Sequence, residues 1–340
     1  MNYLKQIFML ISVIVVLILP ASIMAKTINL NYSIFFPGTH GQCIDGVNWA
    51  KEIEKRTNGR IKITVFPGGT LTKANQCFDG VKNGISDLGM SCFAYTRGRF
   101  PVMEAVDLPL GYPDGIVATR VANAFYKKFW PEKPDELKDV KVLYLHAHGP
   151  GLLHTTKPVR TLEDFRNLKI RSTGLSSKVV GALNGVSVAM SQGGTYEALQ
   201  KGVVEGSFGP IEVLKGWRQA EVVKYSTNCY NIGYTTSMFV VMNLKRWNDL
   251  PADIQKIFDE VSNEWIDVHG KTWNSGDEKG REYTKSRGNK IIELTPQEAA
   301  RWKEKVSPVI DDYINSAKRK GLPGKKYVDA LYELIAQYSK

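Results

Sequence analysis

The chemistry of this sequence centres on Arg171, which lies where a short strand is expected to end. Residues Lys169–Ser172 are predicted to form that strand, followed by a helix at 175–183, a second strand at 186–190 and a helix at 195–201. In open parallel sheets, ligands bind in the crevice beyond the carboxyl ends of the strands. The planar guanidinium of Arg171 suits a carboxylate in such a crevice; the alternative is a surface arginine at a strand end.

Three histidines, His146, His148 and His154, offer a different chemistry. Alternation along a strand places His146 and His148 on one face, as a pair of metal ligands requires. His154 could supply a third ligand, but no HExxH-like helix or ligand-spaced acidic cluster accompanies these residues. A metal-dependent periplasmic hydrolase using His146 and His148 is therefore kept as an alternative, with polar strand histidines as the simpler explanation. No GxSxG elbow, Walker loop or dinucleotide fingerprint occurs.

The elements that must position these residues alternate between strand and helix. Strands are expected at 28–34, 60–66 and 86–90, with helices at 41–57 and 77–83 between them. This βαβαβ order predicts an α/β fold with a parallel sheet. A chain of 340 residues exceeds the size at which single cores stop growing, so two lobes are expected.

The later part of the chain predicts a hinge. A strand at 140–147 leads across to the second lobe, and a β-rich run at 232–242 returns to the first lobe. Two crossings permit the lobes to close around a ligand. Residues 251–288 have apolar positions at three-to-four spacing, which predicts a helix long enough to span both lobes.

The motifs resemble those of the periplasmic solute-binding proteins of TRAP transporters, the DctP-like family. The resemblance covers nearly the whole mature chain and rests on the order of several segments, none specific by itself: 49–60 (WAKEIEKRTNGR), 66–69 (FPGG), 108–109 (LP), 161–164 (TLED), 168–173 (LKIRST), 186–190 (VSVAM) and 196–206 (YEALQKGVVEG). It implies a two-lobed periplasmic-binding-protein fold with a hinge and a long lobe-spanning helix. We expect lobe I at 26–147 plus 235–260, and lobe II with the C-terminal helices at 148–234 plus 261–340.

The resemblance implies a receptor rather than an enzyme, with no cofactor. Such a receptor captures a small organic acid anion, a carboxylate or a sulfonate, and delivers it to an ion-gradient-driven permease made of a small and a large membrane subunit. In this family the strand arginine, here Arg171, clamps the ligand carboxylate. A sensory ligand-binding module with the same fold is a second alternative.

Two departures from the family pattern bear on the ligand. Where the family often carries an asparagine that helps to hold the carboxylate, this chain has Gly209. Many acid-binding members also carry a second arginine after the first crossing, where this chain has Gly151 to His154. Both losses favour a monoanion with an apolar or modestly polar body.

Further candidates for ligand contact are expected at strand ends and in the loops beyond them. For each of these residues the alternative is ordinary packing. Two further aromatic residues, Trp217 and Tyr234, lie either in the cleft or in the core. The predicted ligand-binding set is Arg171, Gly209, Phe208, Tyr95, Phe93, His40, Gln192 and Tyr196.

The N-terminus predicts export. Lys5 precedes an apolar run at 7–19, and a cleavage region follows at 20–25, so residues 1–25 are expected to be a cleaved secretory signal that directs the protein to the periplasm. The net charge of +11 comes from Lys and Arg spread along the chain without a basic tract, which argues against nucleic-acid binding.

Four cysteines occur in a compartment that permits disulfides. The segment around Cys43 (QCIDGV) is echoed around Cys77 (QCFDGV), each opening the helix after one of the first two strands. Neighbouring parallel strands would bring these helix starts together, which predicts a Cys43–Cys77 bridge. The alternative is buried free thiols.

Overall fold

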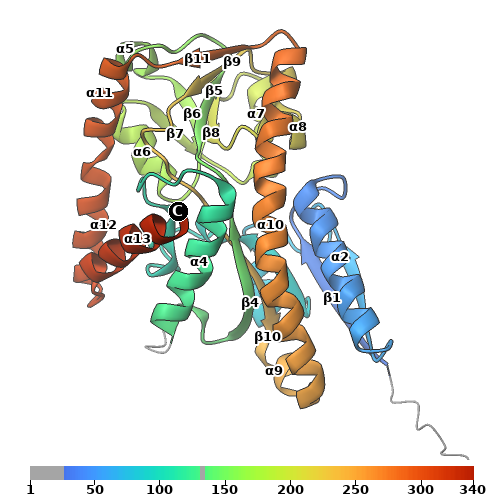
Figure 1. The fold of residues 1–340 in the computed structure, drawn as a ribbon. Coiled ribbons are helices and arrows are strands. Elements are labelled where there is room, and N and C mark those ends of the chain that lie inside the picture. The colour runs from blue at the N-terminus through green and yellow to red at the C-terminus, as the bar shows by residue number, and fades with distance from the viewer. Residues whose placement is uncertain (1–26, 131–134) are drawn as a thin grey trace, which may run out of the picture.

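The computed structural model describes residues 27–130 and 135–340 and contains two sheets joined by one long helix (Figure 1). The predicted signal segment, 1–25, lies outside the described residues. Within the described ranges, no helix is both long enough and apolar enough to cross a bilayer.

The first sheet has the strand order β2-β1-β3-β10-β4. Its first three strands are parallel, and β10 runs antiparallel to both β3 and β4. The strands are β1 (Ile28–Ile34), β2 (Ile61–Phe66), β3 (Leu88–Cys92), β4 (Val140–Ala147) and β10 (Ser237–Asn243). The helices that follow its strands are α2 (Gly41–Arg56), α3 (Cys77–Lys82), α4 (Gly115–Phe129) and α9 (Leu244–Asn248).

The second sheet has the order β11-β9-β5-β8-β6-β7, with β6 parallel to β7 and β8. Its strands are β5 (Leu152–Thr155), β6 (Lys169–Ser172), β7 (Val186–Ala189), β8 (Gly206–Gly209), β9 (Tyr225–Asn228) and β11 (Lys290–Glu293). The short helices between them are α5 (Leu162–Phe165), α6 (Ser176–Ala182), α7 (Thr195–Gln200) and α8 (Val213–Gly216). Arg171 lies next to the carboxyl end of β6, and the hydroxyl of Thr173, just beyond this strand, donates to the Ala94 carbonyl of the first layer.

The long helix α10 (Ala252–Ser286) runs beside both sheets (Figure 1). It packs against α2, α4 and β4 of the first sheet's layer and against α8 and β11 of the second. Its apolar face, which includes Ile254, Phe258, Val261 and Trp273, is buried. The sequence-based expectation of one helix spanning two lobes agrees with this arrangement.

The C-terminal helices divide between the two layers. Helix α11 (Pro296–Val306) packs on α5 and α6, whereas α13 (Gly324–Tyr338) packs on α4, beside the first sheet. Helix α12 (Pro308–Arg319) contributes Val309 and Tyr313 to the same apolar core as α4. Helix α12 also contacts α6, so the C-terminal helices pack against both layers.

The bridge expected between Cys43 and Cys77 is absent, and both residues are buried free thiols. The strand order explains the difference. The chain moves from β1 outward to β2 and then back past β1 to β3, so right-handed crossovers place α2 and α3 on opposite faces of the sheet. Cys43 accordingly packs with Trp49 in one core and Cys77 with Phe78 in the other.

We expect the described cysteines to stay reduced and unreactive in the folded protein. Burial raises the pKa of Cys43 to about 11 and that of Cys77 to about 12, so both thiols are protonated at neutral pH. A thiol reagent should label the native protein slowly and titrate four thiols after denaturation. Two or fewer thiols in the denatured, unreduced protein would contradict this expectation.

Candidate functional site

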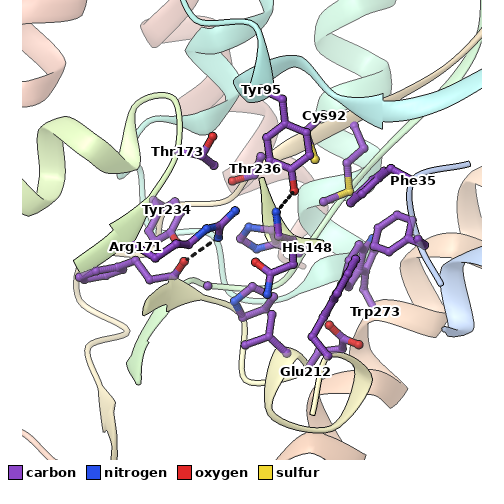
Figure 2. Close-up of a pocket in the computed structure, with 18 residues that line it drawn as sticks. Phe35, Cys92, Tyr95, His148, Arg171, Thr173, Glu212, Tyr234, Thr236 and Trp273 are labelled. Carbon is purple, nitrogen blue, oxygen red and sulfur yellow. Dashed lines mark hydrogen bonds between the residues drawn. The ribbon is translucent and has the colours of Figure 1, made fainter. Parts of the chain in front are cut away.

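A pocket lies between the two sheets (Figure 2). Its walls come from strand ends and adjoining loops of both sheets and from α10. The lining residues are Phe35, Phe36, Cys92, Tyr95, His148, Arg171, Thr173, Gln192, Phe208, Gly209, Pro210, Glu212, Val213, Trp217, Tyr234, Thr236, Met238 and Trp273.

Arg171 is the cation of this pocket. Its side chain is almost completely buried, with 4% exposure. Its Nε donates to the Met190 carbonyl at 3.1 Å and its Nη1 to the Phe208 carbonyl at 3.4 Å. None of the ion pairs among the described residues involves Arg171. Burying a charge without a counter-ion is costly, so an anion beside this guanidinium would be stabilising.

Neutral polar groups surround the guanidinium. Burial lowers the pKa of His148 to about 4, with Arg171 adding to the decrease and the Gly149 carbonyl opposing it, so this imidazole is neutral at neutral pH. Burial likewise raises the pKa of the Tyr95 phenol. The Tyr95 hydroxyl accepts a hydrogen bond from the Gln192 backbone N–H at 3.2 Å. The charge of Arg171 is therefore not cancelled by these neighbours.

The body of the pocket is apolar and aromatic. Phe35 and Trp217 lie parallel, with ring centroids 6.1 Å apart and an interplanar angle of 19°. Phe36, Phe208 and Met238 complete this wall. Flat aromatic surfaces opposite a guanidinium suit a ligand with one anionic end and an apolar or aromatic body.

His154 supports the pocket from behind. Its Nδ1 accepts from the Ser226 hydroxyl at 2.9 Å, and its Nε2 donates to the Gly209 carbonyl at 3.1 Å. His154 therefore holds the loop at Gly209 in place. It lies after the first crossing between the lobes, where many acid-binding family members are expected to carry a second arginine. The two departures seen in the sequence are in direct contact.

A family model described as "Bacterial extracellular solute-binding protein, family 7" (DctP) matches residues 34–316, well over half of the chain. The chain belongs to this family. The C4-dicarboxylate-binding periplasmic protein DctP of Rhodobacter capsulatus is 29% identical over 267 residues, which are 76% of this chain and 78% of that protein.

Solved structures of TRAP solute-binding proteins are similar along nearly the whole chain. A TRAP solute-binding protein of Rhodoferax ferrireducens, solved with copurified benzoate, is 27% identical with a TM-score of 0.87, covering 92% of this chain and 99% of that one. One from Desulfovibrio salexigens is 32% identical with a TM-score of 0.80, covering 92% and 97%. That structure is an open complex with the C-terminus of a symmetry mate in its ligand site. The two-lobed TRAP receptor fold expected from the sequence is confirmed.

Five of the eight residues predicted to bind ligand line this pocket of the family 7 receptor: Arg171, Gly209, Phe208, Tyr95 and Gln192. Phe93 does not line it, because its ring is buried against Phe100 and Phe239 at centroid distances of 4.9 Å and 5.2 Å. The 3-10 turn Phe93–Tyr95 directs the ring of Phe93 into the core and that of Tyr95 into the pocket.

His40 and Tyr196 line a second, adjoining hollow. His40 caps α2, where its Nδ1 accepts from the Gln42 backbone N–H, and its Nε2 lies 2.8 Å from Glu212 Oε1. The Tyr196 hydroxyl donates to Glu221 at 3.0 Å. Both residues thus lie beside the pocket rather than in its wall.

Several residues that line the pocket were not predicted from the sequence, although they lie at or beyond strand ends as Arg171 does. Phe35 and Phe36 follow the carboxyl end of β1, and Glu212 follows that of β8, so the strand-end rule would have identified them. Trp273 gave no such signal, because it continues the apolar stripe of α10.

The geometry does not favour the metal-hydrolase alternative. Across 27–130 and 135–340, no group of three or more His, Cys, Asp or Glu side chains is arranged to hold a metal ion. His146 instead accepts from the Trp273 indole N–H at 3.1 Å and stacks on His269, with ring centroids 4.5 Å apart. His148 contacts the Gly149 carbonyl through Nδ1 at 2.5 Å.

Proposed function

We propose that this chain is the extracytoplasmic receptor of a TRAP transporter and that its pocket binds the monoanion of a small organic acid through Arg171. The observation that carries the proposal is the buried guanidinium with no carboxylate partner among the described residues. A ligand carboxylate would accept charge-assisted hydrogen bonds from the planar fork. Among the described residues that line the pocket, Arg171 is the one cation, which argues for one anionic group on the ligand rather than two.

The apolar wall narrows the ligand further. Phe35, Trp217 and Phe208 offer ring surfaces that would pack on an aromatic or aliphatic body. Copurified benzoate in the Rhodoferax relative is consistent with such a body. A sulfonate has the same charge with a different shape and belongs in any test of the site.

Transport by this protein would require export and membrane partners. We propose that residues 1–25 are a cleaved signal, that the mature receptor acts in the periplasm, and that it delivers its ligand to a small and a large permease subunit. The protein would catalyse no reaction, in keeping with the solute-binding role of its family.

The proposed function predicts ligand-dependent stabilisation of the purified mature protein. A ligand present at one hundred times its Kd adds about 2.7 kcal/mol to the free energy of unfolding, which raises the Tm by several degrees. A thermal-shift screen should compare monocarboxylates, dicarboxylates, aromatic acids and sulfonates, each with and without a chelator. We expect monoanions to stabilise the protein in both conditions. No shift with any acid, or a shift lost on chelation, would contradict the proposal.

A further inference from the structure

The pocket contains two buried polar atoms without partners in addition to the charge of Arg171. One is Nε2 of Gln192, a donor on a side chain with 7% exposure, and the other is Oε2 of Glu212, on a side chain with 6% exposure. Both side chains line the pocket. Buried polar atoms are almost always hydrogen-bonded, so both atoms point to groups that a ligand supplies.

The two atoms belong to different ends of the pocket. Gln192 follows β7, the neighbour of the Arg171 strand, and its backbone N–H donates to Tyr95. The side-chain amide of Gln192 therefore lies at the same end of the pocket as Arg171. Glu212 lies on the loop after β8, and Figure 2 shows it on the other side of the drawn residues from Arg171, near Trp273. The pocket thus has a donor end and an acceptor end.

His40 lies against the other oxygen of the Glu212 carboxylate. The Gln42 backbone N–H donates to His40 Nδ1, so the imidazole proton lies on Nε2. That nitrogen is 2.8 Å from Glu212 Oε1. His40 therefore lies against one carboxyl oxygen without a hydrogen bond of good geometry, and Oε2 is left for a donor from elsewhere.

The surroundings hold Glu212 in this position. Its backbone N–H donates to Asp277 Oδ1 of α10 at 3.1 Å. A Cβ on Gly216 would lie 1.8 Å from Glu212 Oε1, and one on Gly276 would lie 2.7 Å from its Cγ. Glycine at both positions leaves room for the acid side chain, which is therefore fitted closely against α8 and α10.

We infer that Glu212 selects the ligand: the preferred acid carries a hydroxyl, away from its carboxylate, that donates to Oε2 of Glu212. This inference rests on the proposed function, because Arg171 must hold the carboxylate at the other end. An acid without the hydroxyl leaves the buried oxygen unpaired, which costs binding free energy. Sites with a buried acceptor therefore reject ligands that lack the matching donor. A neutral hydroxyl costs less to bury in this pocket than a second charged group would.

The test compares matched ligand pairs by titration calorimetry on the mature protein. Each pair differs by one hydroxyl: benzoate with its 3-hydroxy and 4-hydroxy forms, phenylacetate with its 3-hydroxy and 4-hydroxy forms, and butyrate with 4-hydroxybutyrate. We expect at least one hydroxylated acid to bind at least about tenfold more tightly than its parent. Equal affinity within every pair would overturn the inference. So would tighter binding of 3-(aminomethyl)benzoate than of every hydroxylated acid.

A variant ties the preference to this residue. In Glu212→Met the hydroxyl preference should fall to within about twofold, while the parent acid keeps its affinity within a few-fold, because Arg171 is untouched. Glu278→Met, an exposed acid on α10, is the matched control and should keep the preference. A preference that survives Glu212→Met would overturn the assignment.

The outcomes separate this inference from the proposed function. If no acid binds in any pair, the proposed function itself is wrong. If parent and hydroxylated acids bind equally, the receptor role stands and only the role of Glu212 is wrong. The comparison of ligands on the unaltered protein decides this even where Glu212→Met folds poorly.

Discussion

Replacing Arg171 by alanine is expected to weaken acid binding by about a hundredfold or more. The guanidinium is the pocket's buried cation, and its Nε and Nη1 are fixed by the carbonyls of Met190 and Phe208. Its orientation is therefore set before the ligand arrives, so little side-chain entropy is lost on binding. A hundredfold change equals about 2.7 kcal/mol, which is ordinary for a buried charge-assisted pair.

Two controls make this measurement specific. Arg171→Lys keeps the charge but loses the planar fork, so its affinity should fall between those of the unaltered protein and Arg171→Ala. Arg97→Ala removes an exposed arginine from the loop after β3 and should leave affinity unchanged. Unchanged affinity for acids in a folded Arg171→Ala protein would contradict the assignment of Arg171 to the anion site.

The position of Arg171 could be predicted because it depends only on the sequence pattern of the strand that contains it. The four residues of β6 have the boundaries expected from the sequence, and a rule about strand ends then places the side chain in a crevice. Phe208 and Gly209 end β8, which lies next to β6, so their proximity follows from the same unit. Residues close together in one βαβ arrangement are what sequence patterns determine best.

The other wall of the pocket depends on how the two sheets face each other. Phe35 and Trp217 are 182 positions apart in the chain, and no periodicity shows that their rings lie parallel. The Cys43–Cys77 prediction failed for a related reason. Helix positions relative to a sheet depend on the strand order, which the local sequence does not contain.

The contact between α10 and the pocket loops also depends on tertiary structure. Gly276 and Gly280 are four residues apart, on one face of this helix, and that face receives the segment Ile211–Glu212. In the sequence these glycines only weaken a helical pattern. In the structure they let the backbone of the second lobe approach the helix that both lobes share.

Gly280→Ala is therefore expected to be destabilising and to impair binding, although alanine favours helices. The new Cβ would lie 2.4 Å from the Ile211 carbonyl oxygen and 3.0 Å from Glu212 Cα, both of which are backbone atoms. Relieving the overlap requires a shift of the main chain, at a cost of about 1–3 kcal/mol. Because Pro210 and Glu212 flank Ile211 and line the pocket, we also expect about tenfold weaker acid binding.

The matched control is Gly181→Ala in α6, where a Cβ would meet nothing within 4 Å. There only the helix propensity changes, so the free energy of unfolding should stay the same or rise by up to about 1 kcal/mol, and the Tm should not fall. Thermal unfolding and calorimetry of both variants give the comparison. If Gly280→Ala matched Gly181→Ala in stability and affinity, the close approach of Ile211 to α10 would not shape the pocket. A loss confined to Gly280→Ala would mean that the lobe-spanning helix sets the position of the Glu212 loop, and through it the acceptor end of the site.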